Sequence, residues 1–237
     1  MSTRLSVLAI AALVLALLVT PTWASASSMR WGISGFGGYQ TYSMSDVNDF
    51  TAEVNDSATA NGLTGSLEDV KHGVGFGGGF RGMNEKCIFS LDYVRLNAST
   101  SADFSDGSGN TVNAEFKVPA NGVTVGAAYL FPSSHKARFG LGAGIGYYAS
   151  DAKVTVGGAS AFNDVKGHGV GFHGMGLMDS PLSNAVHVEL AAGYRYAKTS
   201  NLEIDGQEAL NPDGSKAKID WSGLMTQLGL TFYFGQK

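Results

Sequence analysis

The sequence predicts an all-β fold in which eight antiparallel strands, joined in up-and-down order, close into a transmembrane β-barrel. Three observations predict it. The segment 222–234, close to the C-terminus, alternates between mostly apolar residues and small or polar ones. Seven other segments alternate in a similar way, and the connections between the eight are short and long in turn. A leader typical of exported proteins precedes them all.

The segment 222–234 is the clearest strand. One face carries Leu224, Thr226, Leu228, Leu230, Phe232 and Phe234. The other face carries Gly223, Met225, Gln227, Gly229, Thr231 and Tyr233. A period of two with unlike faces is typical of a β-strand. The apolar face is as long as the roughly 9–11 residues that cross a bilayer, and it ends in aromatic residues, as membrane interfaces favour.

The N-terminal residues 1–26 have the three parts of a secretory signal peptide. Arg4 provides a basic start, an apolar run covers residues 5–19, and Ala24-Ser25-Ala26 forms a cleavage site. The apolar run is shorter than the roughly 20 residues of a membrane-spanning helix. We therefore expect cleavage after Ala26, which leaves one barrel domain over residues 27–237.

Charge and cysteine content exclude other classes of protein. Without Arg4, the remaining 15 Lys and Arg residues stand against 20 Asp and Glu residues, a net charge of −5. An acidic chain is a poor match for nucleic acid, so no nucleic-acid partner is expected. Cys87 is the single cysteine, which excludes an internal disulfide bond.

The predicted strands alternate between short and long connections. The eight strands are residues 30–42, 71–83, 87–99, 118–131, 137–150, 166–178, 185–199 and 219–234. The short connections are residues 84–86, 132–136 and 179–184, and the long ones are 43–70, 100–117, 151–165 and 200–218. Short periplasmic turns and long extracellular loops are typical of outer-membrane barrels. The flanks of residues 106–110 also alternate, so we expect some long loops to continue as hairpins, whereas 43–70 reads as an acidic, irregular loop.

Charged residues fall on one face of several predicted strands. A charge on the lipid face of a barrel costs about 2–4 kcal/mol at the midplane, so we expect these residues to point into the lumen. The predicted polar set of the lumen is Asp92, Arg138, His173, His187, Glu189, Arg195 and Gln227. Eight strands leave an interior that is just wide enough for side chains. The charges could form a buried ion-pair network of Asp92, Arg138, Glu189 and Arg195, or line a narrow gated pore.

Catalytic and metal-binding interpretations have less support in the sequence. His187 and Glu189 share a face, and His173 lies on the neighbouring strand, but no Ser accompanies a His on a lipid-facing side. His173, His187 and Glu189 are suitable metal ligands, yet their spacing matches no metal motif. We therefore assign no catalytic residue and expect no metal ion or cofactor.

Two further sets of residues mark the membrane boundaries. Six basic residues lie near the long-loop ends of strands, where lipopolysaccharide phosphates would be found: Lys71, Arg95, Lys117, Lys153, Lys166 and Lys198. The alternative is that they only mark strand ends and keep the chain soluble. Alternation places Arg95 on the outward face. The expected interface aromatics are Trp31, Tyr129, Phe131, Tyr194, Tyr196, Phe232 and Phe234.

Taken together, the leader, the eight strands, the loop pattern and the terminal Leu-Thr-Phe-Tyr-Phe234 resemble small outer-membrane β-barrels of Gram-negative bacteria, namely opacity-type surface porins and outer-membrane protein A and X barrels. The resemblance implies export by the general secretory route. It also implies insertion by the barrel assembly machinery, which reads a terminal aromatic residue; here residues 235–237 follow that aromatic. Such proteins are structural proteins, adhesins or narrow pores.

From this resemblance we expect a non-catalytic protein of the cell outer membrane. Its role would be structural, with surface interactions made by the four long loops toward host or cell-surface ligands, and its lipid partner would be outer-membrane lipid and lipopolysaccharide. The first alternative is a porin-like gated pore for ions or small solutes. The second is an outer-membrane enzyme that modifies lipid.

Overall fold

The structure is a computed structural model that describes residues 29–133, 136–160, 165–204, 206–211 and 213–234. The expected signal peptide and residues 235–237 lie outside the described residues. Within the described part, no helix has the length and apolar content needed to span a membrane.

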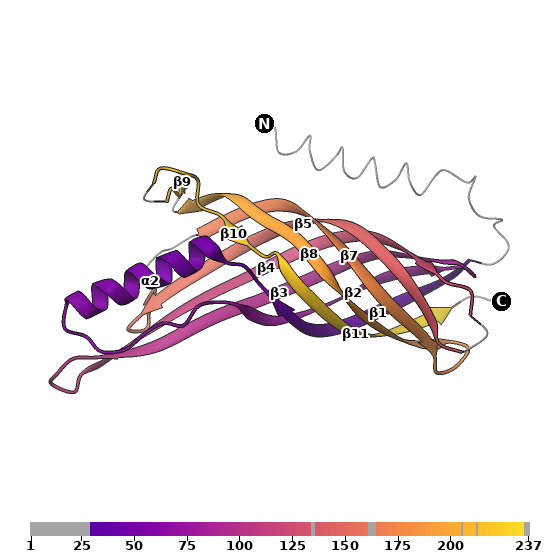
Figure 1. Cartoon of the computed structure of the whole chain (residues 1–237), viewed down its shortest axis with the longest axis horizontal. Helices are drawn as coiled ribbons and strands as arrows, with labels where there is room; N and C mark the ends of the chain where they lie inside the picture. Colours follow the sequence, from indigo (N-terminus) through magenta and orange to yellow (C-terminus); the bar gives the residue numbers. More distant parts are fainter. Residues whose placement is uncertain (1–28, 134–135, 161–164, 205, 212, 235–237) are drawn as a thin grey trace.

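Eight long strands form the body of the described chain, and each is antiparallel to both of its neighbours (Figure 1). They are β1 (Arg30–Thr41), β2 (His72–Met83), β3 (Cys87–Ser105), β4 (Thr111–Leu130), β5 (Arg138–Val156), β7 (Val165–Pro181), β8 (Val186–Ile204) and β11 (Gly223–Phe234). The last strand pairs with the first over Trp31 to Gln40, so the sheet closes on itself. The predicted eight-stranded, up-and-down barrel is confirmed.

The paired residues also show how far the strands are staggered. Starting at Phe139 on β5 and crossing β7, β8, β11, β1, β2, β3 and β4 from partner to partner leads back to β5 at Ala149. The return point is ten residues further along the strand, from 139 to 149. Such a stagger requires tilted strands, typically by about 35–45°, and gives an eight-stranded barrel an interior filled by side chains.

The strands differ in length, and this sets the shape of one end. Strands β1, β2 and β11 have 12 residues each, whereas β3, β4, β5 and β8 have 19 or 20. Because roughly 9–11 residues cross the bilayer, the longer strands project beyond it. We call this the long-loop end and the opposite one the short-turn end; the β3–β4 hairpin reaches furthest at the long-loop end (Figure 1). The expected hairpins are therefore present. The strands predicted to end at 99, 150 and 199, and the strand predicted to begin at 118, all extend further toward this end than predicted.

Short elements complete the long-loop end. The two-residue strands β6 (Ala159–Ser160) and β9 (Gln207–Glu208) extend the edges of β5 and β8. Strand β10 (Ile219–Asp220) pairs with β8 and is separate from β11. The predicted last strand, 219–234, is therefore interrupted, because Trp221 and Ser222 between β10 and β11 are drawn into the barrel mouth and buried.

The prediction of an irregular loop over 43–70 was wrong for its first half, which forms helix α2 (Ser45–Ala60). Val47, Phe50, Val54 and Ala58 recur at three- or four-residue intervals and give the helix one apolar face. This face packs on the inside of the projecting strands, where the Phe50 ring lies 5.7 Å from that of Phe116 (Figure 1). The helix thus covers apolar surface that β1, β2 and β11 are too short to enclose.

Apolar side chains fill both ends of the lumen. At the long-loop end, Trp221, Met44, Leu96 and Tyr148 belong to one large cluster. At the short-turn end, a smaller cluster contains Met83, Ile88, Ala128, Leu130, Leu177 and Tyr233. The outside of the barrel is also apolar, with Leu224, Leu228, Leu230 and Phe232 on β11 more than half exposed to the surroundings. A lipid-facing surface therefore encloses a lumen that contains an apolar cluster at each end.

Candidate functional site

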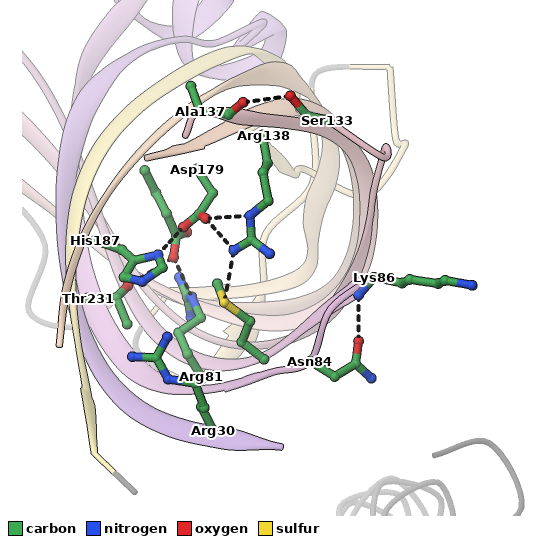
Figure 2. A network of polar contacts seen from close by, with 12 residues as sticks. Arg30, Arg81, Asn84, Lys86, Ser133, Ala137, Arg138, Asp179, His187 and Thr231 are labelled. Atoms are coloured by element: carbon green, nitrogen blue, oxygen red, sulfur yellow. Dashed lines mark hydrogen bonds and ion pairs between the residues drawn. The ribbon is translucent and has the colours of Figure 1, made fainter. Parts of the chain in front are cut away.

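The lumen near the short-turn end contains a charged cluster around Asp179 (Figure 2). Arg138 donates from Nη2 to Asp179 Oδ2 at 2.6 Å and from Nε to the same oxygen at 3.2 Å. The other carboxylate oxygen lies 2.9 Å from His187 Nδ1. The Tyr233 ring packs edge-on against the imidazole of His187, with centroids 4.8 Å apart. Asp179 is fully buried, so its charge depends on these partners.

A second cluster lies further inside and is centred on Arg81. The guanidinium contacts Asp92 at 2.5 Å and Glu189 at 3.6 Å. The Thr231 hydroxyl donates to Glu189 Oε1 at 2.9 Å. These residues come from β2, β3, β8 and β11, so the cluster ties together opposite parts of the wall. It contains two acids and one base, which leaves it with one negative charge when all three groups are ionised.

Arg195 on β8 is held differently. Its Nε and Nη2 donate to the backbone carbonyl of Trp221 at 3.2 and 3.1 Å. Its guanidinium carbon lies 5.8 Å from the centre of the Tyr42 ring and 6.0 Å from that of Tyr148. Among the described residues it forms no ion pair. The cation is therefore balanced by a carbonyl dipole and by aromatic faces rather than by a carboxylate.

A small cavity of about 60 Å³ separates Arg195 from the Arg81 cluster. Its lining includes Asp92, Glu189, His173, Gln227 and Arg195. Apolar side chains form much of the rest of the lining, and a cavity of this size with several polar partners has room for a few water molecules. The lumen therefore contains a charged chamber, negative on one side and positive on the other.

The long-loop end of the chamber is closed by Trp221. The side chain is fully buried, and its Nε1 donates to Ser150 Oγ on the opposite wall at 2.9 Å. Behind it, the chain entering helix α2 is fixed to the same segment, because Met44 donates its backbone N–H to the carbonyl of Asp220 at 3.0 Å. Met44 adopts a left-handed backbone conformation with φ of 46°, which allows its buried side chain to enter the mouth.

Asp46 joins the first and last loops on the outside of this closure. Its Oδ2 accepts from Asn211 Nδ2 at 3.0 Å and from the backbone N–H of Lys218 at 3.1 Å. Partial burial acts to raise the pKa of Asp46, but these hydrogen bonds and one from Ser45 outweigh it, so the pKa lies below its ordinary value. The ionised carboxylate thus stabilises the contact between the two loops.

The predicted lumen residues all face inward, but they do not form the expected single network. The proposed grouping of Asp92, Arg138, Glu189 and Arg195 was wrong: the first three belong to two separate clusters, and Arg195 to neither. The sequence interpretation missed Arg81 and Asp179. Alternation along 71–83 places Arg81 inward. Asp179 falls in the predicted turn 179–184, because the predicted strand ends at residue 178 whereas β7 continues to Pro181.

The described residues do not bring the weighed metal ligands together. No group of three or more His, Cys, Asp or Glu side chains is placed to hold a metal ion there. His187 contacts Asp179 and Glu189 contacts Arg81 and Thr231, so the weighed set with His173 does not converge. His187 is also buried inside the barrel and does not reach the lipid-facing surface.

The interface aromatics all point outward. Trp31, Tyr129, Phe131, Phe232 and Phe234 lie toward the short-turn end, and Tyr194 and Tyr196 lie toward the long-loop end. Tyr39 and Tyr147 stand at the same end as Tyr194, and each packs against a histidine, His72 and His168 respectively. The two girdles mark the edges of the apolar band.

Several of the basic residues near the long-loop end already have acidic partners. Lys71 contacts Asp69 at 2.9 Å, Lys117 contacts Glu115 at 2.8 Å, and Lys198 contacts Asp220 at 3.0 Å. Lys153 lies opposite Lys117 in the β4–β5 pairing, and Lys166 lies opposite Asp151 and Glu203. Within the described residues, the hydrogen bonds of Arg95 go to neutral side chains, those of Asn97 and Asn121.

Comparison with known proteins identifies the family. The family model described as outer membrane protein beta-barrel domain matches residues 10–231. The chain belongs to this family. Membership places the protein in the outer membrane and agrees with the fold. No curated protein matches the sequence.

Among solved structures, the chain is similar to small outer-membrane proteins at low sequence identity. Neisserial surface protein A has 15% identity and a TM-score of 0.44, and the match covers 86% of this chain and 97% of that one. OprG from Pseudomonas aeruginosa has 14% identity and a TM-score of 0.42, with coverage of 88% and 95%. Ail of Yersinia pestis has 13% identity and a TM-score of 0.42, with coverage of 87% and 99%.

Proposed function

We propose that this protein is a non-catalytic outer-membrane barrel with a structural role, which makes surface interactions through its long-loop end. The observation that carries the proposal is the closure of the lumen. Trp221 and Met44 fill one end, and Leu130, Leu177 and Tyr233 fill the other. A barrel closed in this way adds a rigid element to the outer membrane and presents its projecting elements outward.

The projecting elements have an exposed, acidic surface. Asp49, Glu53 and Asp56 lie on the side of helix α2 that faces away from the barrel. They recur at four- and three-residue intervals and so form one stripe along the helix. In our proposal this stripe and the β3–β4 hairpin contact host or cell-surface ligands, while outer-membrane lipid and lipopolysaccharide surround the wall. Export follows the general secretory route, and the barrel assembly machinery inserts the chain.

A narrow gated pore is the second candidate function, favoured by the charged cavity between Arg195 and the Arg81 cluster. In a pore, the Trp221 closure would have to move, which requires breaking its hydrogen bond to Ser150 and the contacts of Arg195 with its carbonyl. Ions would then meet the acidic side chains of Asp92 and Glu189. No feature of the described residues favours the lipid-modifying enzyme over these two.

Conductance separates the two candidates. Purified, refolded protein in a planar bilayer should show no discrete current steps if the lumen is closed. Trp221→Ala, which removes the largest side chain of the closure, is the comparison. Steps in the wild-type protein would contradict the closed-barrel proposal and support the pore.

Surface adhesion tests the role of the long-loop end. Cells that display the protein should change their binding to host-cell and abiotic surfaces when Asp49→Lys and Glu53→Lys reverse the helix stripe. Heat-modifiable mobility on a denaturing gel checks that the barrel still folds. Identical adhesion of the wild-type and reversed proteins on every surface would contradict the proposed interaction role.

A further inference from the structure

Arg95 is a cation on the lipid-facing side of the barrel wall. Along β3, the outward residues on the short-turn side of it are Phe89, Leu91 and Tyr93, which are all exposed and apolar or aromatic. On the other side the outward residues are Asn97, Ser99 and Ser101, followed by Asp103. Arg95 is therefore the first charged residue above the apolar band on this strand.

The length of the strand places Arg95 at the outer edge of the membrane. Lys86, in the short turn, points away from the barrel on the opposite side of the membrane (Figure 2). The nine residues from 86 to 95 extend about 30 Å along a strand, or roughly 23 Å along the axis of a tilted barrel. An outer-membrane barrel has an apolar band about 25 Å tall, so Arg95 lies at headgroup height.

The contacts of Arg95 leave its charge unbalanced. Nε donates to Asn97 Oδ1 and Nη1 donates to Asn121 Oδ1, each at 3.2 Å. The Tyr93 hydroxyl also donates to Asn121 Oδ1, at 2.5 Å. In the described part of the chain, no carboxylate pairs with this guanidinium. The lysines at 71, 117 and 198 differ, because each has an acidic partner.

The two asparagines add hydrogen-bond donors to the same place. Each turns its amide oxygen toward Arg95, so each amide nitrogen points away from the guanidinium. Neither nitrogen has a hydrogen-bond acceptor among the described residues. The remaining guanidinium N–H groups and these two amide groups form a set of donors, and an anion that offers only acceptor oxygens matches such a set.

We propose that Arg95, Asn97 and Asn121 bind a phosphate group of lipopolysaccharide in the outer leaflet. The cluster faces lipid and stands at headgroup height, where the lipid anchor of lipopolysaccharide carries its phosphates. Arginine suits the task because its planar fork can bind two phosphate oxygens at once. Tyr93 positions Asn121 through its hydroxyl and is not itself a ligand.

The inference depends on the outer-membrane location and not on what the loops bind. A failure here therefore leaves the closed-barrel proposal unaffected, and conductance of the wild-type protein would not affect this site. The lysines that have acidic partners provide an internal comparison of the same charge near the long-loop end.

The test is equilibrium binding of fluorescent lipid A, the phosphorylated anchor, to the mature barrel in mixed micelles. Arg95→Gln should weaken binding about tenfold, as expected for the loss of one charge-assisted contact to an anion. Lys198→Gln, which removes a cation already paired with Asp220, should change binding less than about twofold. Equal losses in both variants would overturn the assignment, because they would show attraction by general charge.

Asn121→Asp gives an independent variant that keeps the size of the side chain. The new carboxylate pairs with Arg95 and repels phosphate, so lipid A binding should fall at least as far as in Arg95→Gln. Heat-modifiable gel mobility verifies the fold of each variant. Wild-type binding of dephosphorylated lipid A as tight as that of lipid A would overturn the phosphate site. Equal competition by phosphatidylglycerol would overturn its assignment to lipopolysaccharide.

Discussion

Replacing Arg81 by methionine should destabilise the barrel strongly, although methionine has a similar length and is apolar. Arg81 lies between Asp92 at 2.5 Å and Glu189 at 3.6 Å. The three side chains are 9%, 9% and 17% exposed, so water replaces little of the lost attraction. The variant therefore leaves two acidic groups in the lumen with no cation in contact with them.

The magnitude follows from the burial of the cluster. Removing one partner of a buried ion pair costs about 3–5 kcal/mol, because the other charge stays uncompensated. Adding Asp92→Asn and Glu189→Gln to Arg81→Met removes the stranded charges and should recover most of that loss. The exposed pair Lys117–Glu115, at 2.8 Å, is the control, and Lys117→Gln should cost no more than about 1 kcal/mol.

Urea-induced unfolding of the refolded protein in lipid vesicles measures these differences, with the gel mobility of the folded barrel as the readout. The expected order of stability is wild type, then Lys117→Gln, then the triple variant, then Arg81→Met. If Arg81→Met were as stable as Lys117→Gln, the Arg81 cluster would not stabilise the barrel. If the triple variant were no more stable than Arg81→Met, uncompensated charge would not be the cause of the loss.

Three other predictions concern the loops and the closure of the sheet. The pKa of Asp46 is lower in the folded protein than its ordinary 3.8, so the stabilisation by its carboxylate is complete above that value and is lost as the pH falls below it. The protection of the amides of residues 207–218 against hydrogen exchange should therefore fall below that pH in the wild type. Asp46→Asn should abolish this pH dependence. Phe50→Ala should cost helix α2 about 2 kcal/mol of local stability, seen as faster exchange of its amides without loss of the barrel. Gly38→Ala should prevent barrel closure, because its new methyl group would lie 1.7 Å from the backbone oxygen of Thr226. Gly37→Ala should fold, because the atom nearest to its new methyl group lies at 3.8 Å. Equal gel mobility of the two variants would refute this prediction.

Local patterns in the sequence predicted much of the fold. A strand with lipid on one side and lumen on the other must alternate, so the period of two along 222–234 and 185–199 identified both the strands and their inward faces. Connection lengths then indicated which end carries the loops. The spacing of Val47, Phe50, Val54 and Ala58 is a signal for helix α2, but the acidic residues between them favoured the prediction of a loop.

The candidate site was only partly predictable. Alternation gives the direction of a side chain but not its partner across the lumen, because that partner depends on the stagger between strands far apart in sequence. Arg81 meets Glu189 from β8 as well as Asp92 from the adjacent β3. The closure by Trp221 requires a segment between β10 and β11 to turn inward and reach Ser150 on the far wall.

The sequence by itself determined that this chain crosses the outer membrane as eight alternating strands and that the charges within the apolar band lie inside, since both follow from which residues tolerate lipid. Only the tertiary structure decided which charges meet, that both ends of the lumen are filled, and that the guanidinium of Arg95 contacts two asparagines. Those outcomes depend on the ten-residue stagger around the barrel, seen from Phe139 to Ala149, which no single strand encodes.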